Sequence, residues 1–338
     1  MRFSPARSAP IWLGLWLTLG CANGPTGDPS RQATQVNGDA PAVKEIPTGP
    51  FVRVVGTVQD GGFPHAACEH AACRAARDAD ERRYVAGLAI VLPASGRVFL
   101  IDATPDLRAQ LDLLADVRQP PADRVDRAPV DGVFLTHAHV GHYLGLAFFG
   151  FEAIHTRRLP VWATPRMAAY LRSNGPWSQL VDLENIELRE LTLGEPVELG
   201  DGVSVTAVRS PHRDEYSDTV GFVVAGPDAS VFYLPDTDSW DAWDRPLAEI
   251  AGEVDVALLD GSFFSLDELP GRDVASIGHP LIRDSMSRLA DLVASGATRV
   301  VFIHLNHSNP ALLDGSAERE EVEAAGFAVA REGDEIPL

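Results

Sequence analysis

Three histidines within six residues limit most strongly what this chain can be. They lie in the stretch His137-Ala-His139-Val-Gly-His142, directly after the apolar run Val133–Leu135, which is typical of a short buried strand. Imidazole is a common ligand of transition metals, and a turn that leaves a strand lets His137 and His139 approach one ion. We expect His142 to lie on the first turn of a following helix and to point to the same place. The alternative interpretation is a solvated turn with incidental histidines.

The cluster resembles the metallo-β-lactamase fold superfamily, whose defining motif is His-x-His-x-Asp-His. The resemblance implies three further ligands at strand ends: His212 for the first metal, Asp236 between two metals, and His304 as the last histidine. It also implies the fold class, an α/β protein built as a four-layer αβ/βα metallo-β-lactamase sandwich with the metal site at one edge. The active-site metal ligands predicted in this way are His137, His139, His142, His212, Asp236 and His304, and Asp236 is also predicted to be catalytic.

Gly141 occupies the position of the motif's aspartate, and glycine has no side chain that could bind a metal. The first site keeps a full set of ligands for one ion. The second site retains only His142 and His304, together with a share of Asp236. We therefore predict one tightly bound ion, zinc or iron, and a weak or absent second ion. The departure weakens the case for hydrolysis in which two ions polarise substrate and nucleophile.

A second group of metal-binding residue types lies closer to the N-terminus. Cys68 and Cys73 are the only cysteines after residue 50, and His65 and His70 lie beside them. A structural zinc ion needs four nitrogen or sulfur ligands, an oxidising compartment would join the cysteines in a disulfide, and two free thiols are the third alternative. The chain resembles the superfamily branch of the pyrroloquinoline quinone (PQQ) biosynthesis B proteins and the related phosphonate-pathway phosphodiesterases. This resemblance favours a structural zinc and adds His307 to Cys68, Cys73 and either His65 or His70.

Several longer stretches resemble this branch specifically, and the resemblance covers about residues 51 to 338. They are His137–Leu146, Asn174–Gln179, Leu234–Trp240, Gly278–Pro280 and His304–Pro310. The resemblance places His279 at the mouth of the site as a catalytic acid or base or as a substrate contact. The alternative is a structural histidine at the start of a helix. Asp60, Asp238 and Asn306 are candidates for groups that orient the metal-binding histidines, whereas His155 has no motif around it.

The first 21 residues indicate a targeting segment. Two arginines precede the apolar run Ile11–Gly20, which is too short to span a bilayer and is typical of a secretory signal. Cys21 directly after this run resembles the lipid-modified cysteine of bacterial lipoproteins, and an ordinary signal peptide is the alternative. Residues 22–50 are rich in Gly, Pro, Asn, Thr and Asp, which predicts a flexible linker. We expect an exported protein, periplasmic or attached to the cell envelope, that contacts the membrane only through an N-terminal lipid anchor.

Residues 51–338 are predicted to form one domain, because apolar strand-like runs alternate with helical stretches and no Pro/Ser-rich linker interrupts them. Strands are expected at 51–58, 86–92, 98–101, 132–135, 161–163, 203–208, 219–225, 230–234, 256–259 and 299–303, and helices at 106–117, 165–173, 281–295 and 316–325. The chain has 28 Lys and Arg against 48 Asp and Glu, a net charge of −20. This balance argues against a nucleic-acid partner, since such binding depends on clustered basic residues. We expect a small-molecule or peptide substrate instead.

Three functions remain open at this point. The first is a metal-dependent hydrolase, in which the ion lowers the pKa of a water and polarises an ester or phosphoester bond. The second is an iron-dependent oxygenase, because the resemblance implies that the PQQ B proteins hydroxylate a precursor peptide with iron. The third is a non-catalytic metal-binding lipoprotein of the envelope. Export argues against a direct role in PQQ biosynthesis, because a ribosomally made precursor is matured in the cytoplasm.

Overall fold

The computed structural model describes residues 47–118, 128–268, 271 and 278–338. The chain divides into two units, residues 1–45 and 46–338, and the described residues belong to the second unit. The predicted signal segment, residues 1–21, and most of the predicted linker, residues 22–50, lie outside the described residues. Among the helices of the described part, none is both long enough and apolar enough to cross a membrane.

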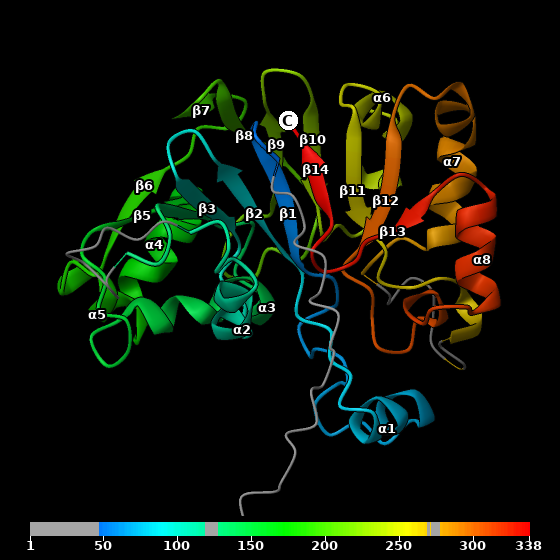
Figure 1. Cartoon of the computed structure of the whole chain (residues 1–338), viewed down its shortest axis with the longest axis horizontal. Coiled ribbons are helices and arrows are strands. Elements are labelled where there is room, and N and C mark those ends of the chain that lie inside the picture. The colour runs from blue at the N-terminus through cyan, green and yellow to red at the C-terminus, as the bar shows by residue number, and fades with distance from the viewer. Residues whose placement is uncertain (1–46, 119–127, 269–270, 272–277) are drawn as a thin grey trace, which may run out of the picture. The chain divides into compact units, whose positions relative to one another are not determined.

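Seven strands form the first sheet, in the order β14-β1-β2-β3-β4-β5-β6 (Figure 1). Their bounds are β1 Phe51–Gly56, β2 Gly87–Leu92, β3 Arg97–Ile101, β4 Gly132–Phe134, β5 Leu159–Ala163, β6 Ile186–Glu190 and β14 Glu335–Pro337. Strands β1, β2 and β3 pair antiparallel, whereas β3 to β6 pair parallel. Every residue of β1 and β2 is buried, so these strands are largely apolar runs without the alternation of a sheet that faces water.

The second sheet also has seven strands, in the order β13-β12-β11-β10-β9-β8-β7. Their bounds are β7 Pro196–Gly200, β8 Val203–Arg209, β9 Val220–Ala225, β10 Ser230–Leu234, β11 Val256–Asp260, β12 Arg299–Ile303 and β13 Ala328–Val329. Strands β7 to β10 pair antiparallel and β10 to β13 pair parallel. Buried residues alternate with half-buried ones along β8, as expected for a strand with one face in the core.

Three apolar clusters hold the layers together. The first lies between the two sheets and includes Leu88 and Ile90 of β2, with Phe222 and Leu258 from the second sheet. The other two clusters join each sheet to the helices outside it. These helices are α2 Leu107–Asp112, α3 Val140–Tyr143, α4 Pro165–Ser173 and α5 Trp177–Asp182 for the first sheet, and α6 Leu247–Ala251, α7 Ile282–Ser295 and α8 Ala317–Ala324 for the second (Figure 1). The predicted four-layer αβ/βα sandwich is confirmed.

The predicted strands agree with the observed ones to within two residues at each end. The helix expected over 106–117 is shorter, because α2 ends at Asp112 and turns follow it. Helix α3 begins at Val140, so His142 lies on the first turn, as predicted.

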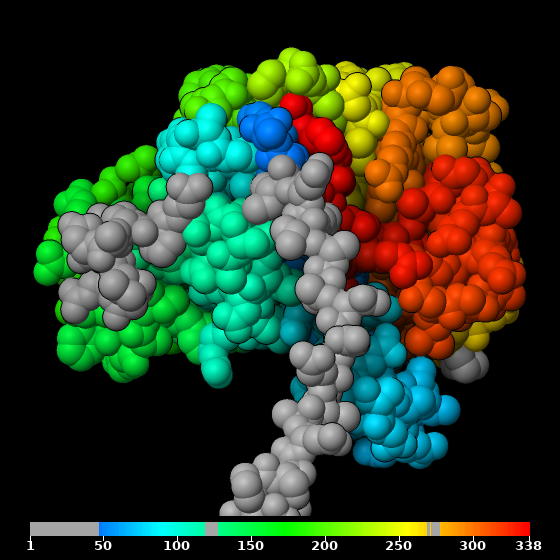
Figure 2. All heavy atoms as spheres, viewed as in Figure 1, coloured from blue at the N-terminus to red at the C-terminus, as the bar shows by residue number. Residues whose placement is uncertain are grey.

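Helix α1, Ala71–Asp78, stands apart from the two helical layers. Figures 1 and 2 show it projecting from the edge of the sandwich at which the β11 and β12 arrows end. Its buried residues Cys73 and Ala76 pack against the cluster that also covers the second sheet. The loop before α1 and its first turn carry the cysteines and histidines of the predicted structural zinc site.

Candidate metal centre

Polar side chains gather where strands of both sheets end. In the first sheet, Asp102 directly follows β3 and His137 comes three residues after β4. In the second sheet, Asp236 follows β10, Asp260 ends β11 and His304 follows β12. Strands that run in the same direction bring their carboxyl ends to one edge of a sheet, which is where α/β proteins place their ligands. The topology therefore assembles residues that lie far apart in the sequence.

Four of the predicted ligands form one compact group. The ligand atoms of His137, His139, His212 and Asp236 all lie within 4.8 Å of one another. Asp236 Oδ2 is 3.3 Å from His137 Nε2, and Asp236 Oδ1 is 3.1 Å from His212 Nε2. His139 Nδ1 is 3.2 Å from His212 Nε2. Three imidazole nitrogens and one carboxylate form a complete ligand set for one transition-metal ion.

Two histidines of this group have their other ring nitrogen held by a carboxylate. His139 Nε2 lies 3.1 Å from Glu215 Oε2, and His212 Nδ1 lies 2.7 Å from Asp238 Oδ1. Such partners fix the tautomer and the orientation of a metal-binding imidazole. The pattern is therefore that of metal ligands with their supporting groups, and the predicted orienting role of Asp238 agrees with its position.

Asp102 supports two further histidines at once. Its Oδ2 lies 2.7 Å from His142 Nδ1, and its Oδ1 accepts hydrogen bonds from the Thr136 backbone N–H at 2.8 Å and the Thr136 hydroxyl at 2.9 Å. Because the Thr136 hydroxyl donates its proton to Asp102, it can only accept from His137 Nδ1, which is 3.0 Å away. This chain of hydrogen bonds assigns the proton to Nδ1 of both histidines. The Nε2 atoms of His137 and His142 are then free to bind a cation.

His142 and His304 form a second pair beside Asp236. Their Nε2 atoms lie 3.7 Å and 3.9 Å from Asp236 Oδ2. His304 Nδ1 is 3.2 Å from Ser262 Oγ. The Asp60 carboxylate, which we expected only to orient histidines, instead forms a group of potential ligands with His142 and His304.

A cation fits this arrangement because several donor atoms lack other partners. Within the described residues, the Nε2 atoms of His137, His142 and His304 are buried and have no hydrogen-bond partner. Burying a polar atom without a partner costs free energy, so native proteins rarely leave three such atoms together. A metal ion bound by these nitrogens would remove that cost.

The charges of the site act differently on its metal-binding histidines. Burial, followed by the positive charge of His142, keeps the pKa of His137 well below its usual value. Burial lowers the pKa of His142, but the Asp102 charge raises it more, to about 9, so that His142 must release the proton on Nε2 when it binds an ion. Burial raises the pKa of Asp236, but the positive charges of nearby histidines, His279 first, have the larger effect and keep this pKa well below its usual value. A neutral His137 beside an ionised Asp236 has the protonation states that metal binding requires.

His279 lies at the exposed rim of the group, with 15% of its side chain accessible. Its Nδ1 is 2.8 Å from Asp260 Oδ2 and 3.2 Å from Asp236 Oδ1. Burial lowers the pKa of His279, but the charges of Asp260 and Asp236 raise it more, to about 9. A protonated imidazole at the rim is placed to donate a proton. Its role as acid, base or substrate contact stays a prediction.

The predicted structural zinc site is only partly assembled. The ring of His307 lies 4.1 Å from that of His65 and 6.2 Å from that of His70, between centroids. Burial, followed by the charges of those two histidines, lowers the pKa of His307 to about 4. Cys68 and Cys73 are free thiols, so the structure does not join them in a disulfide. Neither cysteine belongs to the groups of potential metal ligands found among the described residues, and the zinc site stays a prediction.

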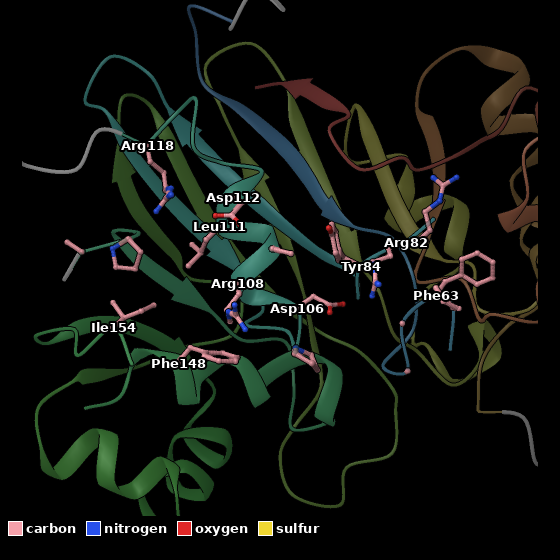
Figure 3. Close-up of a pocket in the computed structure, with 18 residues that line it drawn as sticks. Phe63, Arg82, Tyr84, Asp106, Arg108, Leu111, Asp112, Arg118, Phe148 and Ile154 are labelled. Carbon is pink, nitrogen blue, oxygen red and sulfur yellow. The ribbon is translucent and has the colours of Figure 1, made fainter. Parts of the chain in front are cut away.

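A cavity of about 890 Å³ lies next to the loop that carries Asp60 (Figure 3). Its lining includes Phe63, Tyr84 and Phe148, and none of the predicted active-site ligands lines it. One charged group in its wall already has a protein partner, because Asp106 Oδ2 accepts a hydrogen bond from the Val85 backbone N–H at 2.9 Å. Because no active-site ligand lines this cavity, it is separate from the metal centre.

Sequence reasoning missed several groups that support the site. They are Asp102, Thr136, Glu215, Asp260 and Ser262. Two of them carried a signal, because Asp102 and Asp260 are acidic residues at the end of apolar strands, just as His304 lies at the end of one. Asn306 Oδ1 lies 3.0 Å from Nδ1 of His307, a histidine of the predicted structural zinc site, and its Nδ2 donates to Ser308 Oγ.

The fold and the donor set define a metallo-β-lactamase type of protein, and sequence comparison agrees. Residues 97–305 match the family described as "Beta-lactamase superfamily domain", and the chain belongs to this family. The chain is similar to the coenzyme PQQ synthesis protein B of Methylorubrum extorquens, with 27% identity over 303 residues that cover 83% of this chain and 98% of the relative. It is 29% identical over 316 residues to the protein of the same name from Cupriavidus necator, covering 85% and 99%.

Two solved structures share the fold. One is zinc-bound PqqB from Methylobacterium extorquens, with a TM-score of 0.72 and 24% identity, covering 85% of this chain and 100% of that one. The other is a diphosphatase from the PhnP family, with a TM-score of 0.60 and 22% identity, covering 86% and 98%. The resemblance inferred from the histidine motif is confirmed.

Proposed function

We propose that this protein is a metal-dependent hydrolase that acts on an ester or phosphoester-type substrate. The observation that carries the proposal is the convergence of His137, His139, His212 and Asp236 on one point, with the Nε2 atom of His137 buried and unpaired among the described residues. A bound ion of this kind lowers the pKa of a water and polarises the bond to be cleaved. The substrate would be a small molecule or a peptide.

The chain's own residues supply orientation and a proton. Asp102 and Thr136 hold the rings of His142 and His137 with Nδ1 protonated. Asp260 holds the His279 ring at the exposed rim, where a proton can be donated to the oxygen of a leaving group. The substrate would therefore approach from the side of His279.

The test compares His137→Ala with His155→Ala in purified protein. His155 lies outside the groups of potential ligands, so its variant controls for the loss of an imidazole. We expect His137→Ala to lose the bound metal and at least about 100-fold of the hydrolysis of bis(p-nitrophenyl) phosphate or p-nitrophenyl acetate, more than removal of a mere supporting group costs. If a folded His137→Ala protein hydrolysed these substrates as fast as wild type, the metal would not be catalytic. The protein would then be a non-catalytic metal-binding protein of the envelope.

An iron-dependent oxygenase is the second candidate. It is supported by the donor set, since imidazole and carboxylate suit iron as well as zinc, and by the similarity to proteins named coenzyme PQQ synthesis protein B. Metal analysis separates the two candidates. Iron together with substrate-dependent oxygen uptake would support the oxygenase and overturn simple hydrolysis, whereas zinc together with ester or phosphodiester turnover would do the opposite.

We also propose that the chain is exported and carries a lipid on Cys21. The support is the sequence alone, namely the short apolar run Ile11–Gly20 followed directly by that cysteine. Metabolic labelling with a radioactive fatty acid should label the expressed protein and leave Cys21→Ser unlabelled. Label that persists in Cys21→Ser, or a wild-type protein without label, would contradict the lipid anchor.

A further inference from the structure

Asp60 occupies the space that a side chain at position 141 would need. A Cβ atom built on Gly141 would lie 2.1 Å from Asp60 Oδ1 and 2.7 Å from Asp60 Cγ. Real Cβ atoms do not approach other atoms so closely, so the Asp60 carboxylate and any side chain at residue 141 exclude each other. The carboxylate missing from the histidine motif is thus replaced in space by one from another loop.

The Asp60 carboxylate faces two histidine nitrogens that have no other partner. Asp60 Oδ1 lies 3.7 Å from His142 Nε2 and 3.8 Å from His304 Nε2. Both nitrogens are buried, and neither has a hydrogen-bond partner among the residues that the structure describes. These distances are too long for hydrogen bonds, which end near 3.2 Å for nitrogen and oxygen. The three groups therefore surround a common space and are not simply paired.

The spacing of these atoms suits a metal ion. Asp236 Oδ2 completes the set, at 3.7 Å from His142 Nε2 and 3.9 Å from His304 Nε2. Ligands that bind a tetrahedral ion at about 2.0–2.2 Å lie roughly 3.3–3.6 Å from one another. These four nitrogen–oxygen separations exceed this range by only a few tenths of an ångström, so binding an ion requires Asp60 and Asp236 to move slightly toward the two histidines.

The topology explains why Asp60 reaches this place. Strand β1 runs parallel to β3, because both pair antiparallel with β2. The loop after β1 therefore leaves the sheet at the same edge as Asp102, which follows β3. Gln59 in the same loop contacts the site as well, since its Nε2 donates to Ser262 Oγ at 2.9 Å.

We propose that Asp60 is a ligand of a second metal ion, which it binds together with His142, His304 and Asp236, and that Gly141 is needed to make room for it. The inference rests on the proposed function only in that Asp236 also binds the first ion; it does not require hydrolysis. It replaces the sequence-based prediction of a weak or absent second ion, which did not count Asp60 among the ligands.

The decisive measurement is the number of zinc ions bound per folded chain. Wild-type protein, Asp60→Asn and the control Asp228→Asn, which changes an exposed aspartate between β9 and β10, are titrated with zinc by calorimetry, and bound zinc is counted by elemental analysis. We expect Asp60→Asn to bind one zinc ion fewer than wild type and Asp228→Asn to keep the wild-type count. The thiol loop is the same in all three proteins, so the difference reports the histidine cluster alone. An equal count and affinity for Asp60→Asn and wild type would overturn the proposal.

Substitutions at residue 141 test the same site without removing a ligand. Gly141→Ala must displace the Asp60 carboxylate and should also lose one zinc ion. The exchange variant Asp60→Gly with Gly141→Asp returns the carboxylate to the motif position and should recover the lost ion. A wild-type count in Gly141→Ala, or no recovery in the exchange variant, would contradict the proposal even if Asp60→Asn failed to fold. Two ions bound at the histidine cluster without any hydrolysis would overturn the proposed function and leave this inference standing.

Discussion

Replacement of Asp102 by asparagine should destabilise the metal-free protein and also weaken its metal binding. Asp102 and His142 are both fully buried, and His142 Nδ1 lies 2.7 Å from Asp102 Oδ2. Asp102 has a positive φ of 70°, a conformation that asparagine also tolerates, so the substitution changes the charge and not the backbone. It leaves the His142 imidazole without its counter-charge.

The magnitude follows from the pKa of His142. This pKa is raised to about 9 in the folded protein, against about 6.5 in the unfolded chain, and one unit corresponds to about 1.4 kcal/mol. The carboxylates around His142, Asp102 first and then Asp60 and Asp236, therefore contribute together on the order of 3 kcal/mol to the free energy of unfolding. Because the folded pKa is raised, this stability is fully present below pH 6.5 and is lost as the pH rises through about 9.

The assay is urea denaturation of chelator-treated protein at pH 6 and pH 10. We expect Asp102→Asn to lose most of this contribution, about 2–3 kcal/mol, at pH 6 and much less at pH 10. The control is Asp238→Asn, which also removes a carboxylate from a histidine but at a site with 38% exposure, so that its cost should stay below about 1 kcal/mol. A loss for Asp102→Asn that is the same at both pH values would refute the reasoning.

The same substitution should change which nitrogen of His142 carries the proton. The amide nitrogen of asparagine donates to Nδ1, so the proton of a neutral imidazole moves to Nε2, the atom that faces the metal site. We expect metal affinity to fall about 10- to 100-fold, as for other supporting groups. An unchanged affinity in a competition titration with a chelator would contradict this assignment of the proton.

Three further predictions concern the core between the sheets, the cysteine loop and the histidine cluster. Leu258→Ala removes a fully buried side chain between the sheets and should lower the free energy of unfolding by about 2–5 kcal/mol, measured by urea denaturation with an unchanged m value. Cys73→Ser should release one zinc ion per chain, counted by elemental analysis; an unchanged count would exclude the structural zinc site. Dialysis at pH 4.5 should strip the histidine cluster of metal, because protonated imidazole cannot bind it, and retention of the ion there would contradict a histidine-rich shell around Asp236.

Much of the fold was predictable from the sequence because most strands are apolar runs. Their burial on both faces makes them easy to locate, and β2 and β11 are clear cases. Strand β6, Ile186–Glu190, was missed because its residues become more exposed along the strand and its sequence is largely polar. Helix α1 was missed because its sequence, Ala71–Asp78, is short and mostly small or charged.

The metal-binding histidines were predictable for a different reason. Three of them share one short motif, and His212 and His304 follow strands in the order that the superfamily resemblance implies. Asp60 was expected only to orient histidines, because single aspartates are common in loops, and Asp102 was not identified although it directly follows the apolar strand β3. Their importance comes from the strand order, which places the loops after β1 and β3 at one edge, and sequence periodicity does not reveal that order.

The metal centre takes ligands that follow strands of both sheets, and this has a mechanical consequence. His137 and His142 follow β4 of the first sheet, whereas Asp236 and His304 follow β10 and β12 of the second. A backbone hydrogen bond from Val220 N–H to the Thr136 carbonyl, at 3.1 Å, also joins the two halves nearby. An ion bound by both sets of ligands would act as a further cross-link between the halves of the sandwich. Loss of the ion would then loosen the contact between the sheets as well as the site, so metal supply would help to set the lifetime of the folded protein.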